Sequence, residues 1–339
     1  MLNILQKSVE IINTQFLPHV TLKHIHQFRF GIQAFTFSPF SSLNSNARLV
    51  VENRQTASSK MYRLTRNTGM KKNFFSILKA CSIVHKGSIV IIDFSTFCEF
   101  QVLTLALQTR EGRAIPLFFD IITYPITEAT SQNIFIQQTL KKFHDILGFY
   151  PSFVLDRGFA IPSLITFFID NQITFYVRAK KGKHVVMLNE AGDEQRLSIA
   201  NIQVYDQQIK AYGYQLRLIT SDKPKDKKEP WYILTNDTNR KRKEIIQIYY
   251  YRFEIEEIFK DIKHLFKLKQ FYITEKQPFQ IVLWFIILGT WLAYLIDEIR
   301  LTIQQHSHKK LSFIRLWFEG LHRSFYLQLF NSTHSSHFY

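Results

Sequence analysis

The sequence predicts a mixed α/β fold: one sheet with flanking helices, interrupted by a β-rich insertion and preceded by a helical region. Three observations support this prediction. Three apolar runs between residues 88 and 125, rich in β-branched and aromatic side chains, are typical of buried strands. Helical and strand-like segments then alternate as far as residue 181. Short strands, "KHVVML", "YQLRLIT" and "WYILTN", broken by charged loops, follow between residues 180 and 245.

The composition indicates a large globular protein with an anionic partner. With 339 residues and 46% hydrophobic content, the chain can bury a substantial core in one large domain or two modest ones. Forty-three Lys and Arg against 27 Asp and Glu give a net charge of +16, which favours nucleic acid or an anionic membrane surface.

The two cysteines, Cys81 and Cys98, exclude a disulfide framework and a four-thiolate zinc site. The first twenty residues lack the pattern of a signal peptide. We therefore expect a cytoplasmic protein, associated with the nucleoid if its host is a prokaryote.

An uncharged stretch, residues 279–296, is just long enough for a short transmembrane helix. Its polar interruptions at Gln280, Gly289 and Thr290, and the basic segment before it, fit a buried core helix better. We therefore expect no membrane contact.

The elements are expected in the following order. Residues 1–80 are mainly helical and end in the basic stretch "TASSKMYRLTRNTGMKK", a candidate DNA-facing element. The three apolar runs form an antiparallel meander, with "EGR" as the turn between the last two. The sheet is completed by a helix at about 128–147, a strand at 152–156, a helix from near Pro162 and a strand at 173–181.

Two aspartates close apolar runs. Asp93 follows "SIVII" and Asp156 follows "SFVL", where a charge is costly unless it is paired or metal-bound. Converging carboxylates suit magnesium, which prefers oxygen ligands. A capped or hydrogen-bonded aspartate is the alternative for either residue alone. Asp120 lies in mid-strand, and we expect it to face outward into solvent.

The stretch "YYYRFEIEEIFKDIKHLF", residues 249–266, predicts a helix with one basic and aromatic stripe beside an apolar core face. At about 100° per residue, the stripe holds Tyr249, Arg252, Glu256, Lys260, Lys263 and Lys267. Glu256 is its only acid, because Glu254, Glu257 and Asp261 lie off the stripe. The pattern suits a metal ligand flanked by phosphate-binding cations. An ordinary amphipathic helix with Glu256 paired to Arg252 or Lys260 fits the pattern equally well.

These residues resemble the motifs of a known protein family. Tyr249, Arg252, Glu256 and Lys263 have the spacing Y-x2-R-x3-E-x6-K, which resembles the signature of DDE transposases of the insertion-sequence-four type. "DRGF" from Asp156 resembles the family's second-aspartate motif, and "VIIDFST" around Asp93 is similar to its first-aspartate strand. The order of elements resembles a ribonuclease-H-like transposase core, and the resemblance covers about residues 58–300.

The resemblance implies a catalytic site and a DNA-binding surface. Asp93, Asp156 and Glu256 would hold two Mg²⁺ ions, with Mn²⁺ able to substitute, and activate water and then a DNA 3'-hydroxyl for in-line attack. Tyr249, Arg252 and Lys263 would bind phosphates near the transposon end. Trp231 would stack on a flipped base during hairpin formation, and a buried strand aromatic is the equal alternative for it.

The implied function is cut-and-paste transposition: cleavage and strand transfer at the terminal inverted repeats of an insertion sequence, by a homodimer that also binds target DNA. The alternative is a catalytically inactive DNA-binding derivative. The expected division is a helical region that is a candidate for DNA binding (1–80), the first part of the core (81–178), the β-rich insertion (179–245), the rest of the core with the Glu helix (246–300) and a helical tail (301–339).

Overall fold

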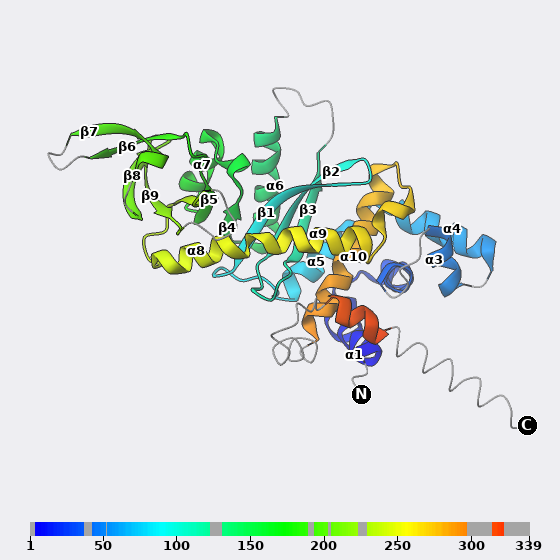
Figure 1. Cartoon of the computed structure of the whole chain (residues 1–339). Coiled ribbons are helices and arrows are strands. Elements are labelled where there is room, and N and C mark those ends of the chain that lie inside the picture. Colours follow the sequence, from blue (N-terminus) through cyan, green and yellow to red (C-terminus); the bar gives the residue numbers. More distant parts are fainter. Residues whose placement is uncertain are drawn as a thin grey trace, which may run out of the picture.

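A ten-stranded mixed sheet organises the chain (Figure 1). The computed structural model describes residues 4–36, 43–51, 53–122, 131–188, 193–202, 205–222, 229–296 and 314–321. The expected start of a helix at 128–130 and most of the expected tail at 301–339 lie outside these residues.

One half of the sheet forms the core predicted from the sequence. Strands β1 (Ile89–Phe97), β2 (Phe100–Leu107) and β3 (Ile115–Ile121) make an antiparallel meander. β4 (Ser152–Leu155) pairs in parallel with β1, and β5 (Phe175–Arg178) pairs in parallel with β4. The order β3-β2-β1-β4-β5, with these directions, is the ribonuclease-H-like arrangement, so the predicted fold class is confirmed.

The other half of the sheet comes from residues 184–235. Its strands are β6 (His184–Leu188), β7 (Glu194–Ser198), β8 (Asp206–Ala211), β9 (Tyr214–Thr220) and β10 (Tyr232–Thr235). β10 pairs antiparallel with β5, so these strands extend the core sheet. The sequence predicts β6, β9 and β10 but not β7 or β8, because "EQRLS" and "DQQIKA" are mainly polar, have half or more of their residues exposed and lack an apolar run.

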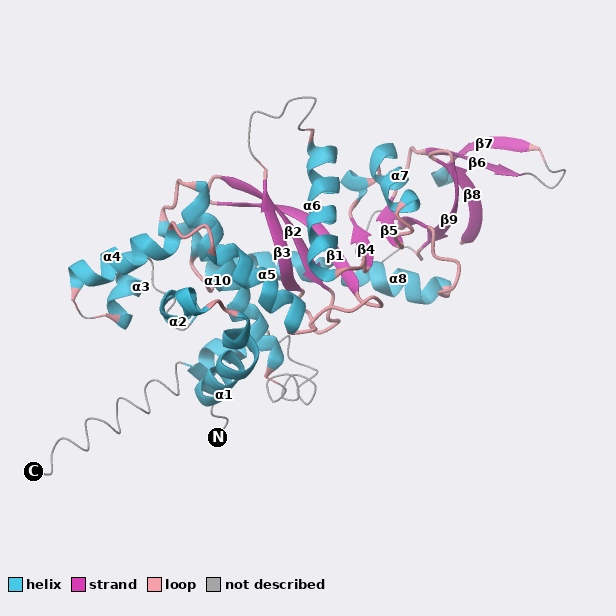
Figure 2. Ribbon diagram, turned by 180° about the vertical axis from the view of Figure 1, so that it is seen from behind, coloured by secondary structure: helices cyan, strands magenta, loops and turns pink. Residues whose placement is uncertain are grey.

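Helices cover both faces of the core strands. α6 (Gln132–Leu147) and α5 (Met70–Ala80) lie on one face and α9 (Glu254–His264) on the other, as the opposite views in Figures 1 and 2 show. α7 (Pro162–Asp170) follows β4, and α8 (Arg242–Tyr250) leads from the inserted strands back to α9. Ser131 caps α6 by accepting a hydrogen bond from the Ile134 N–H, and Gly148, at φ 80°, ends it.

The N-terminal helices surround α10 (Lys276–Leu295), as Figure 2 shows. These are α1 (Ile4–Ile11), α2 (Ile25–Gly31), α3 (Leu43–Val50), α4 (Arg54–Thr65) and α5. Phe285 of α10 packs against Phe28 and Phe74, with ring centroids 5.6 and 5.2 Å away. A Cβ on Gly31 would lie 2.2 Å from the Phe285 ring, so α2 can approach α10 this closely only with glycine there.

α10 is the described helix that by length and composition could cross a membrane, with a mean hydropathy of 1.7 over its most apolar window. However, 83% of that window is buried inside the protein, so the prediction of a core helix is confirmed. The short helix 314–321 packs nearby through Trp317, whose Nε1 donates to Ser8 Oγ at 3.1 Å.

Two predictions about local structure are wrong. Asp120 is 7% exposed rather than solvated, because α6 covers that side of β3, and its Oδ2 lies 2.5 Å from Lys142 Nζ. Residues 249–266 do not form one helix: a 3₁₀ turn (Tyr251–Phe253) separates α8 from α9, and Lys267, at φ 51°, lies beyond α9. A wheel of 100° per residue therefore does not carry across the whole stretch.

A buried polar network fixes the end of β10 against β5. Tyr176 and Arg240 donate to Asp237 Oδ2 at 2.5 and 2.8 Å, and the backbone N–H groups of Asn239 and Arg240 donate to its Oδ1. Burial alone would raise the pKa of Asp237, but these hydrogen bonds outweigh it and lower the pKa to about 2.

This network predicts a pH-dependent stability. Because the pKa of Asp237 is depressed by folding, its stabilising effect is complete above the unfolded pKa and is lost as pH falls towards 2. Asp237→Asn is expected to lower the free energy of unfolding by about 2 kcal/mol at neutral pH and by progressively less in acid. Urea unfolding of both proteins along a pH series measures the difference, and a difference that does not change with pH would contradict the assignment.

Candidate catalytic site

Asp93 and Asp156 are brought together by the parallel pairing of β1 and β4. The register places Ile92 opposite Leu155, so Asp93 and Asp156 occupy the next pair of positions on neighbouring strands. Neighbouring strands lie about 4.8 Å apart, and paired residues point to the same face. α9 contacts β1. Two carboxylates therefore face the segment that carries Glu256.

Arg252 joins the carboxylates of two different elements. Its Nη1 lies 3.3 Å from Asp93 Oδ2, and its Nη2 lies 2.8 Å from Glu256 Oε1. Its side chain is 6% exposed, and its Nε is buried with no hydrogen-bond partner. Tyr249 donates its hydroxyl to Asp156 Oδ1 at 3.2 Å. The segment from Tyr249 to Glu256 thus contacts both aspartates.

The site holds more negative than positive charge in a partly buried place. Burial raises the pKa of Asp93 to about 6, the carboxylates of Asp156 and Glu256 add to this rise, and Arg252 opposes it. Burial also raises the pKa of Tyr249, with a contribution from Asp156. Three acids around one guanidinium make a site that favours added positive charge.

The donor set fits divalent cations. Carboxylate oxygens are the ligands that Mg²⁺ prefers, and the Glu256 side chain is 46% exposed, so it is free to turn towards the aspartates. As the site stands, however, no three His, Cys, Asp or Glu side chains among the described residues are close enough to hold one ion. The Arg252 guanidinium lies between Asp93 and Glu256 instead.

Lys263 extends the same face of β1. Its Nζ lies 2.9 Å from Ser95 Oγ and 5.2 Å from the centroid of the Phe97 ring. Asp93, Ser95 and Phe97 alternate along the strand and therefore share one face. Lys263 is thus a cation beside the carboxylates, and Ser95, which the sequence did not single out, positions it. Lys260 points away and pairs with Glu257.

The family follows from a sequence match. The family model described as "Transposase DDE domain" matches residues 119–292, just over half of the chain. The chain belongs to the Transposase DDE domain family. The match includes Asp156, Trp231 and the segment from Tyr249 to Lys263, while Asp93 lies before it. Domains of this family depend on divalent metal ions, and transposases bind DNA.

Among solved structures, this transposase-domain chain is similar to a piggyBac transposase synaptic complex with hairpin DNA, determined by cryo-EM. The similarity has a TM-score of 0.49 at 11% identity, and it covers 94% of this chain and 76% of that chain. No curated protein matches the sequence.

Trp231 lies in the interior rather than on a DNA-facing surface. It is 5% exposed, and its ring packs 5.2 Å from Tyr249 and 6.1 Å from Phe253. This arrangement is that of a buried strand aromatic, one of the two alternatives given for Trp231 from the sequence. Tyr250, next to Tyr249, is 61% exposed.

Glu254 has a structural role that the sequence did not reveal. It is 4% exposed and accepts hydrogen bonds from the backbone N–H groups of Thr109, Arg110 and Gly112, in the turn between β2 and β3. It thereby ties the start of α9 to the meander that carries Asp93. An acid at the start of a helix was the sequence feature that could have indicated this role. Its hydrogen-bond partners, however, are about 145 residues earlier in the chain, and no local sequence pattern connects them to Glu254.

Proposed function

We propose that this chain is a DDE transposase of the insertion-sequence-four type, which cleaves DNA and transfers strands at the ends of its element. The observation that carries the proposal is the contact set of Arg252 with Asp93 and Glu256 and of Tyr249 with Asp156. The sequence separates Tyr249 from Asp156 by 93 residues and Arg252 from Asp93 by 159. Residues that share a transposase-like spacing thus converge on one place.

In the proposed reaction, Asp93, Asp156 and Glu256 hold two Mg²⁺ ions, or Mn²⁺ in their place. When bound, the ions supply Lewis acidity and an activated water or 3'-hydroxyl for in-line attack on a phosphodiester. Tyr249 holds Asp156 in position through its hydroxyl. Arg252 and Lys263 bind the phosphates on either side of the cleaved bond, because a guanidinium and an ammonium both bind phosphate oxygens.

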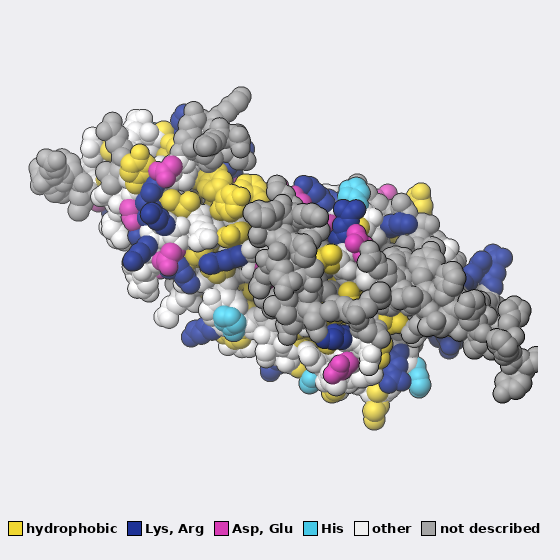
Figure 3. All heavy atoms as spheres, turned by 60° about the horizontal axis from the view of Figure 1, so that its bottom comes forward, with side chains coloured by type: hydrophobic (Ala, Val, Ile, Leu, Met, Phe, Trp, Pro, Cys, Tyr) yellow, Lys and Arg dark blue, Asp and Glu magenta, His cyan; other side chains and the backbone are white. Residues whose placement is uncertain are grey.

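The proposed substrate is DNA with the terminal inverted repeats of the element, joined to target DNA by a homodimer, with a hairpin at the cut end. The net charge of +16 supports an anionic partner. On the face shown in Figure 3, Lys and Arg are spread over the length of the molecule, with Asp and Glu between them at a few places. We propose the same division into five segments and a cytoplasmic location.

The proposal is tested by incubating purified protein with duplex DNA that carries the inverted repeats flanking the gene. Nicking at the repeat ends is expected with Mg²⁺ and not with EDTA. Asp156→Asn is expected to reduce nicking by about 10³-fold or more, because the variant lacks one metal ligand. Asp145→Asn, which changes a 77% exposed aspartate on α6, is the matched control and should cut normally.

The alternative is a DNA-binding derivative without activity, which the charge alone would support. Binding of the repeats with no cleavage under any divalent ion, and with identical behaviour of Asp156→Asn, would establish it and refute the catalytic proposal.

A further inference from the structure

The turn that follows β4 presents an arginine and a glycine beside Asp156. Residues Arg157–Phe159 form a 3₁₀ turn directly after that aspartate, and Arg157 and Gly158 are exposed. Among the residues that the structure describes, no ion pair or hydrogen bond holds the Arg157 side chain. Arg157 therefore does not neutralise the site carboxylates, and its charge is available to a ligand.

The fold does not require a glycine at position 158. The φ of Gly158 lies outside the left-handed region, and a Cβ at this position would have no heavy atom within 4 Å. A small side chain would therefore fit here without strain and without contact. A glycine in such a place leaves room for another backbone to come close to the chain. Since no part of the described protein fills that room, we attribute it to a ligand.

The turn is fixed at both ends. The Phe159 N–H donates to Asp156 O at 3.0 Å, and the Phe159 ring stacks on Phe94 with 5.9 Å between the centroids. Tyr212, between β8 and β9, donates its hydroxyl to Ala160 O at 2.7 Å. A ligand at Arg157 and Gly158 would thus meet a surface that is already in place.

A second basic turn lies at the same edge of the sheet. β5 runs parallel to β4, so the turn after β5 also follows a carboxyl end. Lys180 and Lys181 are exposed in this turn. Lys183 Nζ lies 3.9 Å from the centroid of the Tyr212 ring, so Tyr212 contacts both turns. The two turns therefore form one basic edge beside Asp156.

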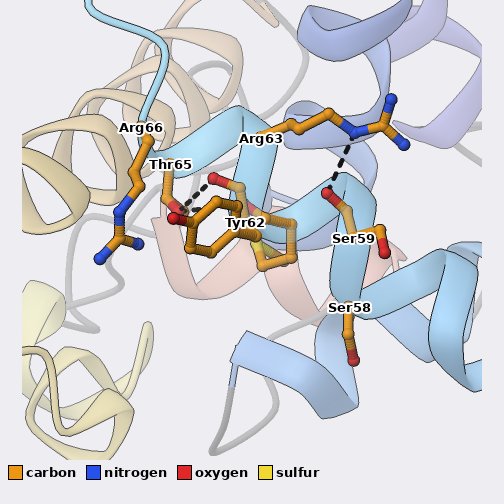
Figure 4. Close-up of a pocket in the computed structure, with 7 residues that line it drawn as sticks. Ser58, Ser59, Tyr62, Arg63, Thr65 and Arg66 are labelled. Carbon is orange, nitrogen blue, oxygen red and sulfur yellow. Dashed lines mark hydrogen bonds between the residues drawn. The ribbon is translucent and has the colours of Figure 1, made fainter.

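This edge differs from the basic surface on α4. Figure 4 shows Arg63 and Arg66 on opposite sides of Tyr62, beside a hollow of about 720 Å³ that is lined by residues 58–66. α4 lies at one end of the molecule and the inserted strands at the other (Figure 1). A ligand on α4 would be remote from the carboxylates. A ligand on Arg157 would be beside them, because Arg157 follows Asp156 in the chain.

We propose that target DNA binds along this edge, with its backbone against Gly158 and one phosphate on Arg157. This inference rests on the proposed function, because strand transfer brings a second DNA to the same carboxylates. In that step the 3'-hydroxyl oxygen of the cut element end bonds to a target phosphorus, and the target's own P–O3' bond breaks. The hydroxyl loses its proton to water, and the leaving 3'-oxygen takes one up.

The two DNA molecules have to approach from different sides. Tyr249, Arg252 and Lys263 lie on the face of the sheet that α9 covers, and they are the proposed contacts of the element end. The edge beyond Asp156 is a second approach to the same carboxylates. An exposed cation and a bare backbone contact phosphates and not base edges, which suits a target of varied sequence.

The test measures target binding separately from binding of the element ends. Protein saturated with unlabelled repeat duplex, without divalent ions, is titrated with a fluorescein-labelled duplex that lacks the repeats, and anisotropy is recorded. Arg157→Gln is expected to weaken binding of the labelled duplex about fivefold or more. It should also lower the salt slope of log Kd by about one, since one phosphate is no longer neutralised. Gly158→Gln should weaken binding more than Gly158→Ala, because the longer side chain keeps the backbone further away.

The matched controls are Lys86→Gln and Gly87→Gln. They change the same kinds of exposed residue just before β1, at the opposite edge of the sheet, and should bind the labelled duplex normally. A second measurement uses Mg²⁺, a pre-cut repeat end and plasmid DNA. The amount of joined product for each nicked end should fall about fivefold or more in Arg157→Gln.

Three results would overturn the proposal: normal binding of the labelled duplex by the Arg157 and Gly158 variants, equal weakening of repeat and labelled duplexes, or equal weakening by the controls. Absence of any binding of the labelled duplex by the unchanged protein would overturn it too. Melting temperatures check that each variant is folded. The anisotropy titration requires no cleavage, so its result can be read even if the catalytic proposal fails.

Discussion

Glu256→Gln is expected to reduce metal-dependent DNA nicking by about 10³-fold or more while leaving the melting temperature nearly unchanged. The Glu256 side chain is 46% exposed and pairs with Arg252, so its replacement removes little from the folded state. A Gln amide keeps the size of the side chain but removes the negative charge that a divalent ion requires. Nicking of repeat DNA and differential scanning fluorimetry on the same preparation measure the two effects.

Glu254→Gln is the matched comparison, because it makes the same change two residues earlier. Here the stability should fall, by about 2 kcal/mol, since an amide turns an NH₂ group towards backbone N–H donors that the buried carboxylate now satisfies. The protein that remains folded should still nick DNA. If Glu254→Gln abolished nicking without a loss of stability, or if Glu256→Gln cut normally, the assignment of the two acids would be wrong.

These two glutamates show what could be predicted from the sequence and what could not. The helical spacing singled out Glu256 among the acids of residues 249–266, because that choice needed only the local order of residues. Glu254 makes its contacts with a turn about 145 residues earlier in the chain. Long-range partners leave no periodic signal, so its burial could not be predicted.

The same distinction holds for the fold. Apolar runs predicted β1 to β5 because a buried strand must be apolar on both faces. β7 and β8 were not predicted, because a strand with an exposed face does not have to be apolar on both faces. Strand alternation alone predicted a solvated Asp120. In the structure α6 covers Asp120, and Lys142 pairs with it. The neighbouring positions of Asp93 and Asp156 depend on the register of β1 and β4, which is set by backbone pairing.

Arg252→Gln is expected to strengthen Mn²⁺ binding in the absence of DNA by about tenfold or more, although it should impair DNA cleavage. The guanidinium now lies between Asp93 and Glu256, two of the proposed metal ligands, and is almost fully buried. At an effective dielectric constant of about 20, two unit charges about 5 Å apart interact by about 3 kcal/mol, and a divalent ion feels twice that repulsion.

Removing Arg252 has an opposing effect, because its charge also holds the pKa of Asp93 down against burial. A proton carries one charge and a metal ion two, so loss of the guanidinium favours the metal by the larger amount. Measurement at about pH 8, above the pKa of about 6 that Asp93 has in the unchanged protein, reduces the competition from protons. Free Mn²⁺ is counted by electron paramagnetic resonance, which requires no activity.

Arg113→Gln is the control, since Arg113 also pairs with acids of α9, Asp261 and Glu257, but not with the site carboxylates. Its Mn²⁺ affinity should equal that of the unchanged protein. Addition of repeat DNA should raise Mn²⁺ affinity in the unchanged protein and much less in Arg252→Gln, because a phosphate gives Arg252 another partner and releases the carboxylates. A weaker Mn²⁺ affinity in Arg252→Gln would instead mean that Arg252 holds the carboxylates in place for the metal.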